Sequence, residues 1–312
     1  MVSSAPAGTT LRIYRAFGLR ILADLALPEL APVEGADDPV FDVEIRRSAV
    51  GTPCDSARSM DPSLHVAKTD VWLETSAGRF RASRGRAIHY EPAPGASAGD
   101  VRLFLLGTML GAILHQRGVL PLHANAIQLG DHAIALAGPS GAGKSTLAAY
   151  FMRQGRTVFS DDVCAVSFDG NGQASVMPGL ARIKLWGETL AALGQSRDGL
   201  DRVAEGFDKF SLPMTRAAVA PAPLRRLYVL ELEAGASIRV ERLTGATAVN
   251  AVLSNIYRWP VAAAMGMTAD HFANAIALAR VCDFWSLRRP RDLSLLPELA
   301  KRVSTENFED LP

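Results

Sequence analysis

Stretches in which apolar and polar residues alternate dominate the first 92 residues of the chain. Side chains of a strand point to opposite faces in turn, so this alternation predicts strands with one buried face. Segments rich in Pro and Gly separate the stretches, and residues 92–100 (PAPGASAGD) read as a linker. We therefore expect a small β-rich domain over residues 1–99. Its predicted strands are residues 11–17, 41–47, 71–76, 78–85 and 87–92.

The pattern changes after this linker to one long apolar run, residues 101–114 (VRLFLLGTMLGAIL). It predicts a buried helix with Asp100 as its N-cap and Gly118 as its stop. About 20 apolar residues are needed to cross a bilayer, and this run is shorter, so we expect no membrane partner.

Strands and helices then alternate to the end of the chain, which predicts an α/β domain over residues 100–312. Two apolar strands joined by Gly130-Asp131 predict a hairpin, so the sheet is expected to be mixed rather than purely parallel. Helical patterns follow in the last third and give this domain its C-terminal helices. The predicted strands are residues 121–129, 132–138, 156–162 and 224–232, and the predicted helices are residues 147–155, 247–258, 270–281 and 296–303.

Composition excludes some classes of protein. Lys and Arg number 33 against 32 Asp and Glu, a balance that disfavours binding nucleic acid through its phosphates. The 3 cysteines are far apart and the histidines lack metal-ligand spacing, which predicts neither a disulfide framework nor a zinc site. The first residues contain no apolar signal segment, so we expect a cytoplasmic protein.

The segment GPSGAGKST is the strongest chemical signal in the chain. It fits the pattern G-x-x-x-x-G-K-[ST], in which backbone amides cradle phosphates, the lysine contacts the β- and γ-phosphates, and the serine binds Mg²⁺. An apolar strand precedes it and a helix follows it, as this mechanism requires. A tight strand–helix turn without a ligand is the competing interpretation. The predicted binding residues for ATP are Gly138, Pro139, Ser140, Gly141, Ala142, Gly143, Lys144, Ser145 and Thr146.

Asp161 and Asp162 follow the next predicted strand. A right-handed strand–helix–strand unit makes this strand parallel to the one before the loop, so both strands end at the same edge of the sheet. Successive side chains point to opposite sides of a strand, so we expect one acid to face Mg²⁺ and the other to act as a general base for an attacking hydroxyl. An acid pair that merely caps a turn is the alternative.

His123 lies at the start of the predicted hairpin. If Leu129 pairs with His132, the register places His123 opposite Gly138, the first residue of the glycine-rich loop. A histidine there can relay a proton to the catalytic centre formed by Lys144 and Asp161. A purely structural histidine at the strand end is the other interpretation.

Residues 120–166 resemble the catalytic core of the HPr kinase/phosphorylase family, and especially its smaller HPr-kinase-like serine kinases. His123, Lys144, Ser145, Asp161 and Asp162 match that family's motifs in order and spacing. The resemblance implies a P-loop fold and transfer of phosphate from Mg-ATP to a serine of a peptide or protein. It also implies that Asp161 is the base and that Asp162 joins Ser145 as a ligand of Mg²⁺. The resemblance also implies lasso-peptide precursors as one class of acceptor. It further implies that the chain forms homo-oligomers.

The family's Glu-Ile-Arg-Gly stretch is replaced here by PGLARIKLW, which lacks an acid, so reverse dephosphorylation and HPr as the acceptor are not expected. A small-molecule kinase and a nucleotide-binding regulatory module remain alternatives. We interpret the basic side chains at four places in the sequence as solvated surface charges: Arg182, Lys184, Lys209 and the run 288–291 (RRPR).

Overall fold

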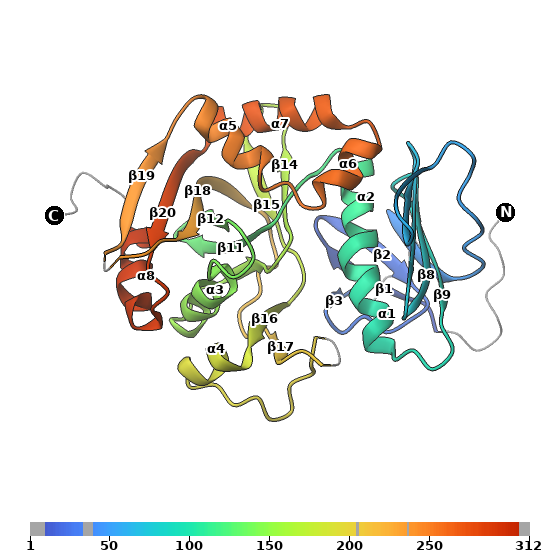
Figure 1. The fold of residues 1–312 in the computed structure, drawn as a ribbon, viewed down its shortest axis with the longest axis horizontal. Helices are drawn as coiled ribbons and strands as arrows, with labels where there is room; N and C mark the ends of the chain where they lie inside the picture. The colour runs from blue at the N-terminus through green and yellow to red at the C-terminus, as the bar shows by residue number, and fades with distance from the viewer. Residues whose placement is uncertain (1–9, 34–39, 204–205, 236, 306–312) are drawn as a thin grey trace. The chain divides into compact units, whose positions relative to one another are not determined.

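The computed structural model describes residues 10–33, 40–203, 206–235 and 237–305. Its contacts divide the chain into two compact units, the first formed by Met1–Pro121 and Tyr257–His271 and the second by Leu122–Ile256 and Phe272–Pro312. Both mix strands with helices, as Figure 1 shows for each unit. The protein is thus of the mixed α/β class, with mixed sheets and C-terminal helices.

The first unit is built on a nine-stranded sheet in the order β3-β1-β2-β4-β9-β8-β7-β6-β5. Its inner positions alternate with polar ones, as in β8, where Gly78, Phe80 and Ala82 are buried. The predicted β-rich character of this region is therefore present. The strands are β1 (Arg12–Ala16), β2 (Leu19–Ala23), β3 (Ala31–Pro32), β4 (Val43–Arg47), β5 (Arg58–Asp61), β6 (Leu64–Val66), β7 (Asp70–Thr75), β8 (Gly78–Ser83) and β9 (Ala87–Pro92).

A continuous helix, Ala98–Gln116, belongs to this first unit, whereas the sequence placed the domain boundary before it. It comprises α1 (Ala98–Phe104), a π-helical turn η1 (Leu105–Met109) and α2 (Leu110–Gln116). The helix belongs to the first unit because its apolar face packs on the sheet of that unit. The rings of Phe104 and Phe80 are one such contact, with centroids 5.7 Å apart. Its N-cap is Ser97 rather than the expected Asp100, because Ser97 Oγ accepts the Asp100 N–H over 3.1 Å.

This helix is the one described helix long and apolar enough to cross a membrane, but 61% of its apolar window is buried within the protein. Gly107 and Gly111 lie against the ring of Tyr257, and a Cβ at Gly111 would overlap that ring. The glycines thus serve close packing inside the unit. The helix ends at Gln116, and Gly118 follows its C-cap Arg117. The φ of +73° at Gly118 and its N–H bond to His115 O confirm the predicted stop. A further helix, α6 (Trp259–Ala264), completes this unit.

The second unit contains a nine-stranded mixed sheet. Seven strands follow the order β10-β14-β15-β18-β12-β11-β13, β20 pairs with β18, and β19 pairs with β20. A separate two-stranded sheet joins β16 and β17. The strands are β10 (Leu120–Leu122), β11 (Ala124–Leu129), β12 (His132–Ala137), β13 (Val158–Ser160), β14 (Cys164–Phe168), β15 (Ala174–Met177), β16 (Arg182–Trp186), β17 (Lys209–Pro213), β18 (Ala222–Leu232), β19 (Arg239–Leu243) and β20 (Asp283–Arg289).

The hairpin of β11 and β12 has the predicted register. Leu129 pairs with His132, and the ladder continues to Ala124 and Ala137. β12 is parallel to β18, and β13 is antiparallel to β11. Since β11 lies between them, β13 runs in the same direction as β12, which confirms the predicted crossover and brings both carboxyl ends to one edge.

Helices cover this sheet and close its core. α3 contacts β11 and lies beside α8, as Figure 1 shows. Their apolar faces share one buried cluster with the sheet, including the fully buried Leu136, Phe151 and Tyr228. The helices are α3 (Lys144–Arg153), α4 (Gly187–Ala192), α5 (Ala246–Leu253), α7 (Thr268–Val281) and α8 (Leu296–Ser304), with a 3₁₀ turn η2 (Leu293–Leu295). This core fixes the edge at which β12 and β13 end.

Candidate functional site

The glycine-rich segment forms the loop between β12 and α3. Gly138, Gly141 and Gly143 have φ values of +125°, +84° and +97°, which residues with a side chain resist. A Cβ at Gly138 would overlap Leu230 O, and a Cβ at Gly143 would overlap the Arg289 guanidinium. The loop therefore needs glycine at Gly138 for conformation and for space, and at Gly143 for conformation and to leave the Arg289 guanidinium in its place.

Two residues outside the predicted motif hold this loop in place. Gly138 N–H donates to Asn255 Oδ1 over 2.9 Å, and Arg289 Nη2 donates to Ala142 O over 2.8 Å. His123 N–H donates to Asn255 O over 2.7 Å, so Asn255 bridges the two strand ends at the hairpin's mouth. The run 288–291 is therefore not simply solvated, because Arg289 is buried and bound to the loop. Burial also lowers the pKa of Arg289.

Lys144 begins α3 and turns back over the loop. Its Nζ donates to Gly138 O over 2.7 Å and to Pro139 O over 3.0 Å, and it lies 3.3 Å from His123 Nε2. The residue is buried, and burial lowers its pKa even though Asp162 and Asp161 oppose this effect. The ammonium thus lies at the mouth of the loop, at the N-terminal end of α3 where unpaired N–H groups favour anions.

Asp161 comes directly after β13 and is the most enclosed acid of the site. Its Oδ1 accepts from Ser145 Oγ and from Asn125 Nδ2, each over 2.6 Å, and its Oδ2 accepts from Lys184 N–H over 2.8 Å. The side chain is buried, and burial together with the charge of Asp162 raises its pKa. Asp161 thus joins the end of β13 to the first turn of α3.

Asp162 faces a different set of partners. Its Oδ2 pairs with Lys184 Nζ over 3.0 Å, and its Oδ1 lies 3.2 Å from His123 Nδ1. Burial alone would raise the pKa of Asp162, but the His123 hydrogen bond and the Lys184 charge outweigh it and hold the pKa well below its usual range. Its backbone φ is +72°, which is uncommon for a residue other than glycine, and its carboxylate contacts side chains that the Asp161 carboxylate does not.

These contacts form one chain across the site. Because an ammonium only donates, His123 Nε2 accepts from Lys144 and His123 Nδ1–H donates to Asp162. Lys184, interpreted from the sequence as a surface charge, contributes its N–H to one acid and its Nζ to the other. Alternation along β16 offered no signal for this role, since it depends on how the two-stranded sheet packs.

The structure brings together all of the residues predicted to act in catalysis. Ser145 contacts Asp161, however, and not Asp162, its expected partner at the metal. Among the other predicted binding residues, Pro139, Ser140 and Gly141 are exposed in the loop, Ala142 is buried, and Thr146 is partly buried in the first turn of α3.

The residues around Ser145 suit a hard cation. Mg²⁺ prefers oxygen ligands and is bound through one or two carboxylates together with phosphate oxygens. Ser145 Oγ and Asp161 Oδ1 offer such oxygens, and the buried Asn125 Oδ1 nearby has no partner within the described part of the chain. The described residues contain no group of three or more His, Cys, Asp and Glu that could hold a metal. The Ser145 and Asp161 oxygens fit a metal whose remaining ligands are phosphate oxygens.

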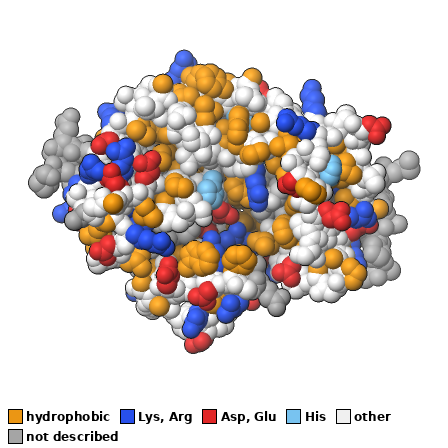
Figure 2. Space-filling view, viewed as in Figure 1, with side chains coloured by type: hydrophobic (Ala, Val, Ile, Leu, Met, Phe, Trp, Pro, Cys, Tyr) orange, Lys and Arg blue, Asp and Glu red, His pale blue; other side chains and the backbone are white. Residues whose placement is uncertain are grey.

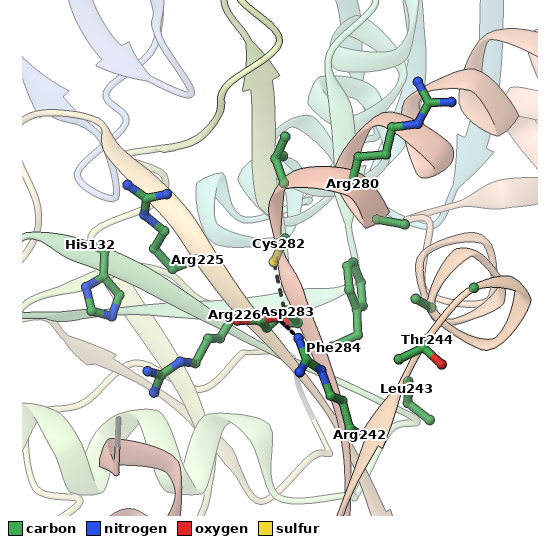
Figure 3. A pocket seen from close by; sticks show the side chains of 14 residues that line it. His132, Arg225, Arg226, Arg242, Leu243, Thr244, Arg280, Cys282, Asp283 and Phe284 are labelled. Carbon is green, nitrogen blue, oxygen red and sulfur yellow. Dashed lines mark hydrogen bonds and ion pairs between the residues drawn. The ribbon is translucent and has the colours of Figure 1, made fainter. Parts of the chain in front are cut away.

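A hollow of about 680 Å³, drawn in Figure 3, lies at the amino ends of β12, β18 and β20. The glycine-rich loop follows the opposite, carboxyl end of β12. His132, Arg225 and Asp283 stand at or near the starts of β12, β18 and β20. Its arginines radiate in different directions in Figure 3, and Arg242 pairs with Asp283 over 2.6 Å. None of the predicted site residues lines it. On the face drawn in Figure 2, acidic and basic side chains are intermingled.

Fold and site together define a mixed α/β protein whose glycine-rich loop and paired carboxylates meet at one edge of the sheet. No protein-family model matches the chain. No curated protein matches it either. Among solved structures it is similar to the Hpr(Ser) kinase/phosphatase from Coxiella burnetii, at 15% identity over 59% of this chain and 88% of that chain, with a TM-score of 0.29. This is a distant similarity of fold, and the proposal below rests on the site.

Proposed function

We propose that the protein is a P-loop kinase that transfers the γ-phosphate of Mg-ATP to a serine hydroxyl of a peptide or protein. The observation that carries the proposal is the bond between Ser145 Oγ and Asp161 Oδ1, beside a loop whose amides and lysine suit phosphate. A strand–helix turn without a ligand has no need for a buried carboxylate at this serine. A magnesium ion, when bound, neutralises charge on the transferring phosphoryl group.

The chain's own residues divide the remaining tasks. The loop amides and Lys144 hold the triphosphate, and Ser145 with Asp161 would hold the metal. Asp162, which is more exposed and bonded to His123, stays ionised because its pKa is held low. It orients the acceptor hydroxyl by accepting its hydrogen bond, and it takes the proton only late, when the forming bond to phosphorus has made the hydroxyl strongly acidic. This reverses the roles expected from the sequence for the two acids, because Asp161 is the one in contact with Ser145.

Transfer from ATP labelled at the γ-phosphate tests the proposal. The full chain is incubated with Mg²⁺ and arrayed peptides that each contain one serine, beside matched peptides with alanine there. We expect label on a subset of serine peptides and on none of the alanine peptides. Label on no peptide, with ATP still bound, would contradict the kinase and favour a nucleotide-binding module.

A small-molecule kinase has the same phosphate machinery and is the second candidate. Label appearing on low-molecular-weight alcohols, and not on any serine peptide, would favour it. Cytoplasmic location, homo-oligomers and acceptors such as ribosomal peptide precursors also remain proposals, drawn from the sequence and its resemblance.

A further inference from the structure

A hollow of about 470 Å³ opens beside the glycine-rich loop. Its volume lies in the range of small-molecule sites. It belongs wholly to the second unit. Its lining residues come from the loop, from the end of β16, from the start of α4 and from the segments before β17 and after β20: Ser140, Gly141, Trp186, Glu188, Asp208 and Arg291.

Trp186 is the unusual member of this set. Its side chain is 44% exposed, although a large aromatic residue contributes most when buried. Lys184 and Trp186 are two positions apart on β16 and so share one face, and Lys184 contacts Asp162. Lys209 Nζ lies 5.6 Å from the centre of the Trp186 ring and holds it by a cation–π contact. The indole is thus held on the face of β16 that carries Lys184, and it remains exposed to solvent.

We propose that this hollow binds the nucleotide's purine base, stacked on Trp186. The inference rests on the proposed function, because the base belongs to the nucleotide whose phosphates occupy the loop. A triphosphate in the loop leaves its nucleoside outside, and this hollow shares Ser140 and Gly141 with the loop. A flat aromatic platform is the feature that proteins use to hold a base.

The rim of the hollow supplies polar groups of the required kinds. Asp208 pairs with Arg197 over 3.7 Å, which leaves Glu188 as the carboxylate we assign to the base. A carboxylate only accepts hydrogen bonds, so it selects a base with an exocyclic amine, such as adenine. Arg291, which lines the same hollow, is a cation suited to the phosphate nearest the nucleoside.

Calorimetry with two probes separates the base from the phosphates. The affinities of the full chain for ATP and for inorganic tripolyphosphate are measured, each with Mg²⁺, in the wild type and in Trp186→Ala. Losing a stacked base costs about 1–3 kcal/mol, so we expect a loss of roughly tenfold for ATP and an unchanged affinity for tripolyphosphate. Trp186→Phe, which keeps an aromatic ring, recovers most of the ATP affinity.

The matched control is Phe272→Ala, which removes another exposed aromatic side chain, 51% exposed on α7, away from the loop. It leaves both affinities unchanged. An equal loss for both probes in Trp186→Ala, or no loss for either, overturns the base site while leaving the kinase proposal intact. Failure of tripolyphosphate to bind the wild type overturns the kinase proposal instead.

The assignment of Glu188 is tested separately, by comparing the affinities of the protein for two nucleotides. Inosine triphosphate differs from ATP at the position of the exocyclic amine, and we expect the wild type to bind ATP more tightly by severalfold. Glu188→Ala removes this preference, while tripolyphosphate binding stays unchanged. A preference that persists in Glu188→Ala overturns the assignment of Glu188.

Discussion

Ser145 Oγ donates a hydrogen bond to Asp161 Oδ1 over 2.6 Å, although the two residues lie 16 positions apart in the chain. The bond links the first turn of α3 to the end of β13. Its acceptor is a buried carboxylate with a raised pKa. A serine of this loop and an acid of the neighbouring strand are the pair that holds Mg²⁺ in P-loop enzymes.

Substituting each of the two acids in turn should separate an effect on ATP binding from an effect on phosphate transfer. We expect Asp161→Asn to weaken ATP binding in Mg²⁺ to the affinity seen without it, because one oxygen of the metal site loses its charge. Asp162→Asn should keep the ATP affinity within about twofold and lower phosphate transfer by about 10²-fold or more, since the base is lost. Calorimetry and γ-phosphate transfer measure the two effects.

Asp198→Asn, which changes an exposed acid outside the site, is the control for both variants. The opposite pattern, with transfer lost and ATP binding intact in Asp161→Asn, would return the base to Asp161. Wild-type transfer in both variants would remove the acid pair from catalysis.

Lys144→Ala should weaken ATP and tripolyphosphate alike. Its ammonium now bonds two loop carbonyls over 2.7 and 3.0 Å and is free to turn to phosphate. Hydrogen bonds from a charged group contribute about 1.5–3 kcal/mol, which predicts a loss of about tenfold to a hundredfold. Lys301→Ala, on the exposed side of α8, should bind both probes like the wild type. Unchanged affinity in Lys144→Ala would rule out the loop as the phosphate site.

Gly143→Ala should damage the loop more than its backbone strain alone explains. Its φ is +97°, and the added Cβ would overlap the Arg289 guanidinium, which bonds Ala142 O. Gly155→Ala is a matched control, with a φ of +81° and open space around a Cβ. We expect Gly155→Ala to lose only the left-handed backbone cost of about 1–2 kcal/mol.

Urea unfolding and tripolyphosphate binding measure the difference between these glycine variants. Gly143→Ala should lose more stability than Gly155→Ala and, unlike it, should lose tripolyphosphate binding. Equal stability losses with binding intact in both would show that the loop does not depend on the Arg289 contact.

A buried histidine pair predicts acid sensitivity in the first unit. His115 Nδ1 lies 2.9 Å from His271 Nε2, and His115 Nε2 donates to Tyr257 O over 2.8 Å. Burial, and then the charge of His271, lower the pKa of His115 from 6.5 to about 4. Between about pH 6.5 and pH 4, the unfolded chain therefore binds a proton at His115 that the folded chain does not bind. The free energy of unfolding falls as pH decreases through this range.

At about 1.4 kcal/mol per pKa unit, this loss is about 3 kcal/mol. Urea unfolding at several pH values measures it. His115→Gln, which does not titrate, should lower stability at pH 7 and flatten its dependence on pH in this window. A slope equal to that of the wild type would show that the pair does not control acid stability.

Much of the fold could be predicted from the sequence because local sequence patterns and tertiary contacts favour the same structure. The hairpin register follows from Leu129 pairing with His132, since a two-residue turn at Gly130-Asp131 leaves no other alignment of the apolar positions. The right-handed crossover then fixed the direction of β13 relative to β12. The domain assignment of the helix 98–116 was not readable, because an apolar helix carries no mark of which sheet it will cover.

By itself, the sequence determined the glycine-rich loop, the direction of the strand after it and the presence of two acids at the same edge. Spacing, glycine conformation and chain chirality are local properties, and they suffice for these features. Only the tertiary structure decided that Asp161 bonds Ser145, that Lys184 reaches both acids, and that Asn255 and Arg289 hold the loop. Those contacts join segments 16 to 147 positions apart, and a side chain's partner across such a distance depends on packing that no local pattern encodes.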